Sequence, residues 1–412
     1  MVEGSPLVKI KPNILLPRVI YGNRGDILSR WGLINGLTAI GQDNFHAFAH
    51  KMTDLPPEAR NKFTPYGKYH NLFLTKEARQ KLKNADRILW SCGLDLTDES
   101  SLAKLLYLLV TFSHYHMLGK ELYCVYQGAG PLKTRKGKKL TKRVLQRVTC
   151  FIARDKYSSE LIHQINPQVP VTLAGDAIFF PGFEEQIEAY ADTTQLDPYL
   201  APEGKPLIAM NIRRWFHFSS DLIPFQLATK RYESRGLQEM DDLVGMYVDL
   251  VHKLRQQYDA RILLISAYNP GVFSWEDDLP WLRRVKASFS DDQEVVLMDT
   301  DMDMMDYLLL MSKIDLAISM RLHSSLTVLR FGNPAVNISY SPKGVNVFRT
   351  LGLEDNAFEI SNAMQNPTNI WLKVESILDD LTGARKKVVQ GVGAIIQTNM
   401  NVLRSLFSGD DE

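Results

Sequence analysis

The sequence predicts an α/β protein built from two doubly wound units. Short β-branched runs alternate with segments of helical period along the chain, which is typical of parallel α/β architecture rather than of a β-sandwich or a helical bundle. The chain is 412 residues long, and a single hydrophobic core stops growing near ~250–300 residues. Two units with a cleft between them are therefore the simplest arrangement.

The first unit is expected in residues 1–190. Its short apolar runs, among them ELYCVYQ and TCFIARD, predict strands, and the segments between them have the spacing of helices. The predicted strands cover residues 18–23, 87–91, 121–127, 149–155 and 170–176, and the predicted helices cover residues 26–41, 101–119 and 138–148.

A domain boundary is expected where the apolar periodicity fades, between residues 183 and 206. The stretch DTTQLDPYLAPEGKP is rich in turn-forming residues. We therefore expect the second unit in residues 205–366, followed by a helical tail, 367–412, whose apolar stripe packs back on the body. The predicted strands cover residues 207–212, 261–266, 295–298, 315–319 and 334–339, and the predicted helices cover 237–258, 303–314 and a segment from Leu322.

The composition argues against a protein that binds through bulk charge. The formal net charge is +1 and 45% of the residues are hydrophobic, so neither nucleic acid nor anionic lipid is attracted by the chain as a whole. Any cationic function must be local. Positive charge is concentrated locally in the run KTRKGKKLTKR. A solvated helix face is the simplest interpretation of this run, and binding of an anionic acceptor or a membrane surface is the alternative.

Neither a disulfide framework nor a metal site is indicated. Cys92, Cys124 and Cys150 are widely spaced and form no Cys-x-x-Cys pair. The N-terminal residues lack a basic region followed by an apolar stretch, and the longest apolar run, LLYLLVTF, is far shorter than the ~20 residues that span a bilayer. We therefore expect a cytoplasmic protein without a membrane span.

Basic side chains follow four of the predicted strands. Ligands of open α/β sheets bind outside the carboxyl ends of the strands, and a cluster of cations at these ends favours a small anion with carboxylate or phosphate groups. The residues are Arg154 in the first unit and Arg213 or Arg214, Arg321 with His323, and Lys343 in the second.

Two glycine-containing loops follow strands of the first unit. The loop YGNRGD places Gly22, Asn23, Gly25 and Asp26 at a strand-to-helix turn, where backbone N–H groups receive anions or polar substrate groups. The loop matches neither the dinucleotide fingerprint nor the P-loop. Glycine used only for turn geometry is the competing interpretation, and it applies equally to the turn QGAGPL after the strand 121–127.

The motifs GNRGD, QGAGPL, ARDKYSSELI, NIRR and SMRLHSSLTVLRFGNPAVNISYSPK occur in the same order in the polysaccharide pyruvyl transferase family, which this chain resembles from about Val19 to Gly352. The resemblance implies a glycosyltransferase-B fold of two Rossmann-like domains facing a cleft. It also implies transfer of pyruvate from phosphoenolpyruvate to two hydroxyls of a sugar, as a cyclic ketal, in the biosynthesis of exopolysaccharide or another cell-surface glycan.

The resemblance also implies roles for the strand-end residues. His323 is expected to act as general acid or base, because histidine titrates near neutral pH. Arg154, Arg213 and Lys343 are expected to bind the carboxylate and phosphate of the donor, while Arg321 either joins them or holds its own loop. Contacts to substrate are expected from Gly22, Asn23, Gly25, Asp26, Gln127 and Gly128.

The resemblance also implies roles for the two domains and their substrates, and the chain departs from the family pattern at one place. The first domain is expected on the side of the sugar acceptor and the second on the side of phosphoenolpyruvate, with no further cofactor. A lipid-linked oligosaccharide, a cell-wall polymer precursor and a glycan terminus all stay open as the acceptor. Family members tend to carry several glycines where this chain has CGLDLTD, with Gly93 alone. Trp215, Phe216 and His217 offer an aromatic wall suited to a sugar face.

Two other functions remain open at this stage. A glycosyltransferase that uses a nucleotide sugar shares the architecture, since fold alone does not set function, and Glu354 and Asp355 could hold a ribose. A non-catalytic protein that binds a glycan or an anionic metabolite would keep the cations and need no titrating histidine.

Overall fold

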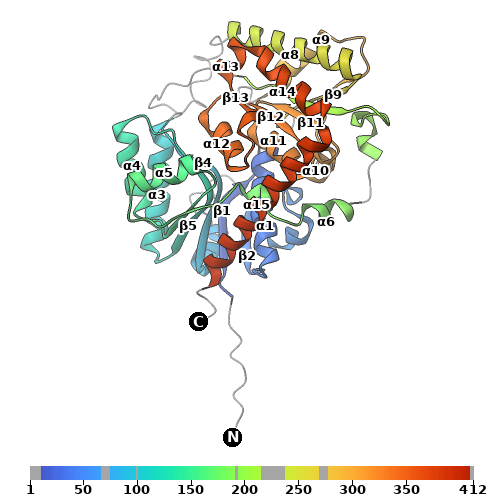
Figure 1. The fold of residues 1–412 in the computed structure, drawn as a ribbon. Helices are drawn as coiled ribbons and strands as arrows, with labels where there is room; N and C mark the ends of the chain where they lie inside the picture. The colour runs from blue at the N-terminus through green and yellow to red at the C-terminus, as the bar shows by residue number, and fades with distance from the viewer. Residues whose placement is uncertain are drawn as a thin grey trace.

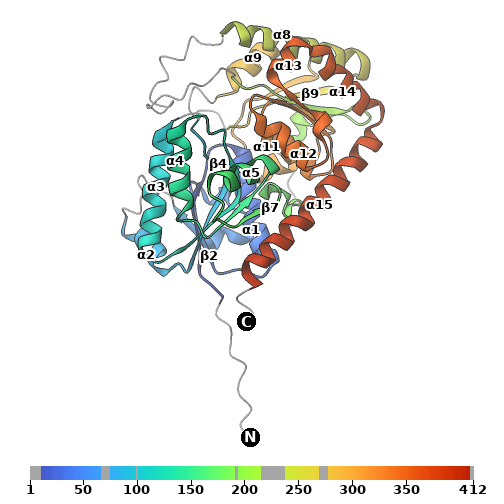
Figure 2. The ribbon, with the colours of Figure 1, turned by 60° about the vertical axis from the view of Figure 1, so that its left-hand side comes forward.

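The structure is a computed structural model, drawn in Figure 1 and, turned by 60°, in Figure 2. It describes residues 11–65, 75–98, 101–190, 194–214, 237–268 and 277–408. Two α/β domains lie one above the other in both views, each with a sheet covered by helices. No helix in these ranges has the length and apolar character needed to cross a membrane.

The first domain contains a sheet of seven strands within the described residues, ordered β3-β2-β1-β4-β5-β6-β7. Every pair is parallel. The strands are β1 (Ile14–Ile20), β2 (Phe45–Ala49), β3 (Phe63–Pro65), β4 (Arg87–Leu96), β5 (Glu121–Ala129), β6 (Cys150–Ala153) and β7 (Val171–Leu173).

Helices cover both faces of this sheet. Several begin at a side-chain cap that accepts a backbone N–H, such as Asn23, Thr134 and Asp155, and such caps stabilise a helix start. The helices are α1 (Arg24–Ala39), α2 (Lys76–Asn84), α3 (Leu102–Met117), α4 (Arg135–Leu145), α5 (Lys156–Ile165) and α6 (Phe183–Glu188), with a short 3-10 turn at Ala177–Phe179.

The second domain repeats this architecture. Its strands form a parallel sheet ordered β10-β9-β8-β11-β12-β13, which is the doubly wound order 3-2-1-4-5-6 when counted within the domain. The strands are β8 (Leu207–Asn211), β9 (Arg261–Ile265), β10 (Val295–Met298), β11 (Leu316–Ser319), β12 (Ala335–Ser339) and β13 (Ala357–Glu359). The helices are α8 (Leu237–Tyr258), α9 (Leu279–Ala287), α10 (Met304–Ser312), α11 (Leu322–Arg330), α12 (Pro342–Thr350) and α13 (Ile360–Gln365).

The chain ends in two helices, α14 (Pro367–Asp379) and α15 (Leu381–Phe407). In Figures 1 and 2, α15 runs from the second domain down along the first. Asn399 on α15 accepts the Gly175 N–H at 2.8 Å and donates to the Asp176 carbonyl at 2.9 Å. The last helix therefore ties the two domains together close to the end of β7.

The domains also share one apolar core. A single cluster of buried side chains extends from Trp31 on α1 through Leu326 on α11 to Leu403 on α15. In addition, Arg24 of the first domain donates its backbone N–H to Ala267 O at 3.0 Å and its guanidinium to Ser266 O at 3.1 Å. The domain interface is thus packed and hydrogen-bonded as a domain core is.

The predicted fold class is confirmed: two parallel sheets with alternating helices and a helical C-terminal segment are present. Helix α8 and strand β10 have the predicted bounds. The sequence interpretation missed β2, β3 and β13, which are short strands toward the sheet edges. None of the three contains a valine or an isoleucine, residues that every predicted strand contains.

Candidate active site

The candidate site lies at the topological switch points of the two sheets. In each sheet the strand order reverses between two neighbours, β1 and β4 in the first domain and β8 and β11 in the second. Open α/β sheets bind ligands in the crevice at this switch point. Asp26 follows β1, Arg213 follows β8 and His323 follows β11, so three predicted site residues come from switch-point strands.

His323 is held between two carboxylates of the opposite domain. It lies in the first turn of α11, and its Nδ1 is 3.5 Å from Asp26 Oδ1 while its Nε2 is 3.4 Å from Asp176 Oδ2. At these distances the contacts are mainly electrostatic. Each ring nitrogen of His323 thus faces a carboxylate oxygen of the first domain.

Gly25 allows this approach. A Cβ atom at Gly25 would lie 2.0 Å from His323 Cβ, a separation that no side chain tolerates. Its N–H group donates to Asn23 Oδ1 at 2.8 Å, so Asn23 caps α1, while Gly22 turns the chain with φ of 87°. The loop YGNRGD therefore uses glycine for close packing and turn geometry, and its first N–H groups are already engaged.

Asp176, which sequence reasoning did not single out, joins the site from the end of β7. Its carboxylate accepts Ser29 Oγ at 2.6 Å, the Ile178 N–H at 3.1 Å and Arg154 NH1 at 3.1 Å. Burial alone raises the pKa of Asp176, but His323, Arg154 and Ser29 outweigh it and hold the pKa well below its usual range. The strand-end rule applied to PVTLAGD would have found this residue.

Arg154 is buried, and part of its guanidinium makes no hydrogen bond within the described ranges, although Nε lies 3.9 Å from Asp155 Oδ2. The residue is 1% exposed, and only NH1 has a carboxylate within hydrogen-bond distance, Asp176 Oδ2. Among the described residues, Nε and NH2 find no hydrogen-bond acceptor. Gly128 provides the room, because a Cβ there would lie 2.9 Å from NH2. Gln127 is buried and donates to Trp90 O at 3.1 Å, so it holds β5 to β4.

Arg213 and Lys343 bring two more cations to the same edge. The guanidinium of Arg213 stacks over the Tyr340 ring at 4.3 Å from its centroid. Burial and the charges of Arg154 and Arg213 lower the pKa of Lys343, although Tyr340 and Asp26 oppose this effect. The pKa of Tyr340 is lowered as well: burial raises it, but Arg213, Lys343 and Arg321 outweigh burial. These cations therefore create a locally positive potential.

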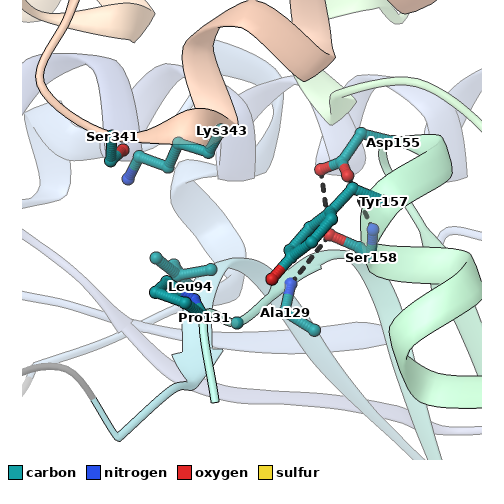
Figure 3. A pocket seen from close by; sticks show the side chains of 9 residues that line it. Leu94, Ala129, Pro131, Asp155, Tyr157, Ser158, Ser341 and Lys343 are labelled. Carbon is teal, nitrogen blue, oxygen red and sulfur yellow. Dashed lines mark hydrogen bonds between the residues drawn. The ribbon is translucent and has the colours of Figure 1, made fainter. Parts of the chain in front are cut away.

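A pocket lies beside these residues, between the two domains. Figure 3 shows Lys343 and Ser341 of the second domain facing Leu94, Pro131 and Tyr157 of the first. Asp155, Ser158 and the turn 129–130 complete its lining. Asp155 caps α5 through the Ser158 N–H at 2.8 Å. The pocket thus combines apolar and aromatic surface with one lysine, one carboxylate and two serines.

Arg321 has a different environment. It is 5% exposed, and its Nε and NH2 donate to both oxygens of Asp278 at 2.7 to 3.3 Å. The guanidinium also stacks over Tyr268 at 5.0 Å. Asp278 is fully buried and accepts Asn211 Nδ2 at 3.1 Å as well. This bidentate pair fixes the start of α11, which carries His323.

Two further arginines, absent from the predicted set, surround Asp26. Burial raises the pKa of Asp26, but His323, Arg30, Arg18 and Lys343 together lower it. Arg18 also explains Gly93: a Cβ at Gly93 would lie 2.0 Å from Arg18 NH1, which is 3.1 Å from Asp95. Arg18 thus fills the space next to the single glycine of CGLDLTD. Trp215, Phe216 and His217 lie outside the described residues.

Two facing doubly wound domains, with charged residues of both at their switch points, define a protein of the glycosyltransferase-B fold class. Solved structures agree with this class. UDP-GlcNAc 2-epimerase from Neisseria meningitidis, bound to UDP-GlcNAc, matches with a TM-score of 0.56 and 10% identity, covering 96% of this chain and 100% of that one. Anabaena HepE in complex with UDP matches with a TM-score of 0.55 and 11% identity, covering 96% and 99%.

Sequence comparison identifies the family. The family model of polysaccharide pyruvyl transferase matches residues 23–342, so the chain belongs to this family. A curated relative, the amylovoran biosynthesis protein AmsJ of Erwinia amylovora, is 24% identical over 338 residues, which are 79% of this chain and 74% of AmsJ. Family membership makes the protein a transferase of polysaccharide biosynthesis.

Proposed function

We propose that this protein transfers the pyruvate unit of phosphoenolpyruvate to two hydroxyl groups of a sugar, forming a cyclic ketal and releasing inorganic phosphate. One observation carries the proposal: a buried arginine with two unpaired donor groups, Arg154, lies beside Asp176 and His323 and in the electrostatic range of Lys343. A site with cations, spare donors and a titrating group suits a small dianion that must be protonated.

The donor is bound by cations of both domains in this proposal. Phosphoenolpyruvate carries a carboxylate and a phosphate, and guanidinium groups bind such groups through two parallel hydrogen bonds. Arg154 offers Nε and NH2, while Arg213 and Lys343 come from the second domain. Burial, together with the charges of Arg154 and Arg213, lowers the pKa of Lys343, and an anion at this point offsets those charges. No further cofactor is assigned.

The chemistry needs two proton movements. His323 gives a proton to the methylene carbon of the donor while one sugar hydroxyl attacks the neighbouring carbon and forms the first C–O bond. The second hydroxyl then forms the second C–O bond as the C–O bond to phosphate breaks. The protons of the two hydroxyls balance the reaction: one replaces the proton lost by His323, and the other leaves with phosphate. Asp26, half-buried beside Nδ1, is placed to accept a hydroxyl proton.

The remaining predicted residues act through these groups. Arg321 is assigned to position α11, because Asp278 already occupies its donors. Gly25 and Gly128 provide space for His323 and Arg154, Asn23 and Gly22 shape the start of α1, and Gln127 holds β5. These residues are positioning residues in the proposal rather than direct contacts to the donor.

A nucleotide-sugar reaction is less well supported. The sequence offers Glu354 and Asp355 as residues that would hold the ribose of a nucleotide sugar. They form the short turn that precedes β13. Because β13 is parallel to β12 and Asn337 pairs with Ala357, this turn lies at the amino ends of the strands. His323 and Lys343 follow carboxyl ends, so the two acidic residues are on the opposite edge of the sheet.

The test is isothermal titration of phosphoenolpyruvate into the full chain and into Arg213→Ala and Lys343→Ala, with Arg283→Ala, an exposed arginine on α9, as matched control. We expect saturable binding that is weakened only in the first two variants. His323→Ala should keep donor binding and lose about 10²–10⁴-fold in turnover. Binding of UDP-glucose without binding of phosphoenolpyruvate would overturn the proposal and favour a glycosyltransferase.

A further inference from the structure

The segment from Lys133 to Arg147 concentrates positive charge on one helix. It contains eight lysine and arginine residues and no acidic residue. Without them the chain, which has 48 basic and 47 acidic residues, would carry more acids than bases. The exposed cations on α4 are Arg135, Lys136, Lys138, Lys139, Lys142 and Arg143. In the part of the chain that the structure describes, none of these six lies within ion-pair distance of a carboxylate.

The neighbouring helix α3 exposes large apolar side chains. Leu106, Val110 and Met117 are 49%, 66% and 76% exposed, and Leu118, just after the helix, is 48% exposed. The spacings of four and seven residues put the three helical residues on one face. Isolated exposed apolar residues are ordinary, but these four lie along one helix and its C-cap and form a stripe.

The apolar stripe and the basic helix are adjacent. Arg147, just after α4, donates from Nε to Ser113 Oγ on α3 at 3.1 Å, and Ser113 lies on the same helix face as Val110 and Met117. Figures 1 and 2 both show α3 and α4 side by side on the outer flank of the first domain, away from α15. We call this surface, formed by the exposed cations of α4 with Leu106, Val110, Met117 and Leu118, the α3–α4 surface.

We propose that the α3–α4 surface docks the protein on an anionic phospholipid bilayer. Unpaired lysine and arginine side chains are attracted to anionic headgroups, and adjacent apolar side chains insert at the boundary between headgroups and acyl chains. Charge complementarity selects this occupant: a second copy of the chain would bring the same cations face to face. A purely polar anionic polymer would leave the apolar stripe uncovered.

The surface lies close along the chain to the candidate site. Gly130 and Pro131 line the pocket of Figure 3, and α4 begins at Arg135 after a short loop. Docking through α4 therefore brings the bilayer close to the pocket, and we infer that the acceptor reaches the pocket from a lipid in that bilayer. This part of the inference, that the acceptor is presented on a lipid, rests on the proposed function, whereas membrane binding does not.

The test is sedimentation of the full chain with vesicles, without substrates. We expect binding to mixed phosphatidylglycerol and phosphatidylcholine vesicles that is lost at high salt, and little binding to pure phosphatidylcholine. Lys139→Gln/Arg143→Gln should weaken binding by about tenfold or more, since each basic residue near an anionic surface contributes on the order of 1 kcal/mol. The matched control is Lys386→Gln/Lys387→Gln, two exposed lysines on α15.

A second pair of variants tests the apolar stripe. Val110→Ser/Met117→Ser should weaken vesicle binding, whereas Leu372→Ser/Val389→Ser, at positions 53% and 58% exposed elsewhere, should not. Melting temperatures check that all variants fold. Equal binding to neutral vesicles, or no effect of either α3–α4 variant, would overturn the proposal. So would failure to bind vesicles combined with salt-sensitive binding to heparin, which would assign the surface to an anionic polysaccharide. Loss of vesicle binding leaves titration with phosphoenolpyruvate unaffected, so the two proposals fail separately.

Discussion

Two buried arginines, one in each domain, follow strands of their sheets and have opposite environments. Arg321 in the second domain gives two of its nitrogens to Asp278, which is itself fully buried. Arg154 in the first domain gives a single N–H to Asp176 and keeps Nε and NH2 without an acceptor among the described residues. The guanidinium of Arg321 is thus hydrogen-bonded to a carboxylate through two nitrogens, whereas Arg154 has two nitrogens without a hydrogen bond in the part of the chain that the structure describes, its Nε lying 3.9 Å from Asp155.

The difference separates a structural from a ligand-binding role. A buried donor without a partner costs free energy, and such groups are retained where a ligand supplies the missing acceptor. Position at a strand end does not separate the two arginines, and the sequence leaves open whether Arg321 binds the donor or holds its own loop. Only the three-dimensional position of Asp278, 43 residues before Arg321, distinguishes them.

The largest expected effect is a loss of stability when the pair of Arg321 and Asp278 is broken. Arg321→Met leaves Asp278 buried without its counter-charge, and breaking a buried pair in this way costs about 3–5 kcal/mol. Urea unfolding measures the loss. The double variant Arg321→Met/Asp278→Asn should recover part of it because the orphaned charge is gone. A loss below about 1 kcal/mol would mean that the pair behaves as a surface pair does.

Substitution of Arg154 should change the affinity for the donor more than the free energy of unfolding. Arg154→Met removes charge-assisted hydrogen bonds worth about 1.5–3 kcal/mol, which corresponds to roughly 10–100-fold weaker binding of phosphoenolpyruvate. Asp176 keeps Ser29 and the Ile178 N–H as partners, so unfolding should change less than in Arg321→Met. Titration calorimetry and urea unfolding on the same variant give both values. Unchanged affinity for phosphoenolpyruvate would mean that Arg154, like Arg321, has a structural role and does not bind the donor.

A third variant tests the space around His323. Gly25→Ala places a Cβ 2.0 Å from His323 Cβ, and overpacking of this kind costs about 1–3 kcal/mol. We expect turnover to fall because His323 moves, with donor affinity nearly unchanged. Gly245→Ala on α8 is the matched control, since its Cβ would meet nothing within 4 Å. Equal turnover in both variants would show that the position of His323 is not critical.

The smallest expected effect is a pH dependence. Because the pKa of Asp176 is depressed in the folded protein, its ionised form contributes stability that is fully present above the ordinary carboxyl value of 3.8 and is lost as pH falls through the lower folded value. Between about pH 5 and pH 3 this amounts to about 1 kcal/mol. In urea unfolding at these two pH values, Asp176→Asn should lose less stability than the wild type. An equal loss in both would contradict the assignment.

Much of the fold was predictable because buried parallel strands and amphipathic helices leave strong patterns, as the segment Leu237–Tyr258 shows. Short strands such as Phe63–Pro65 were not, since three residues carry no period. The strand-end rule gathered Arg154, Arg213, His323 and Lys343 on one edge. It could not reveal that Asp176 contacts His323 across the domain interface, because that contact joins residues 147 positions apart.

The division of His323 and its carboxylates between two domains has a consequence for how the site is assembled. Asp26 and Asp176 belong to the first domain and His323 to the second, and one apolar core joins the two domains. In the proposed reaction, the packing between the domains therefore sets the distance between the proton donor and its carboxylates. A substitution in this core, far from the site, that shifts one domain against the other should lower turnover without changing any catalytic side chain.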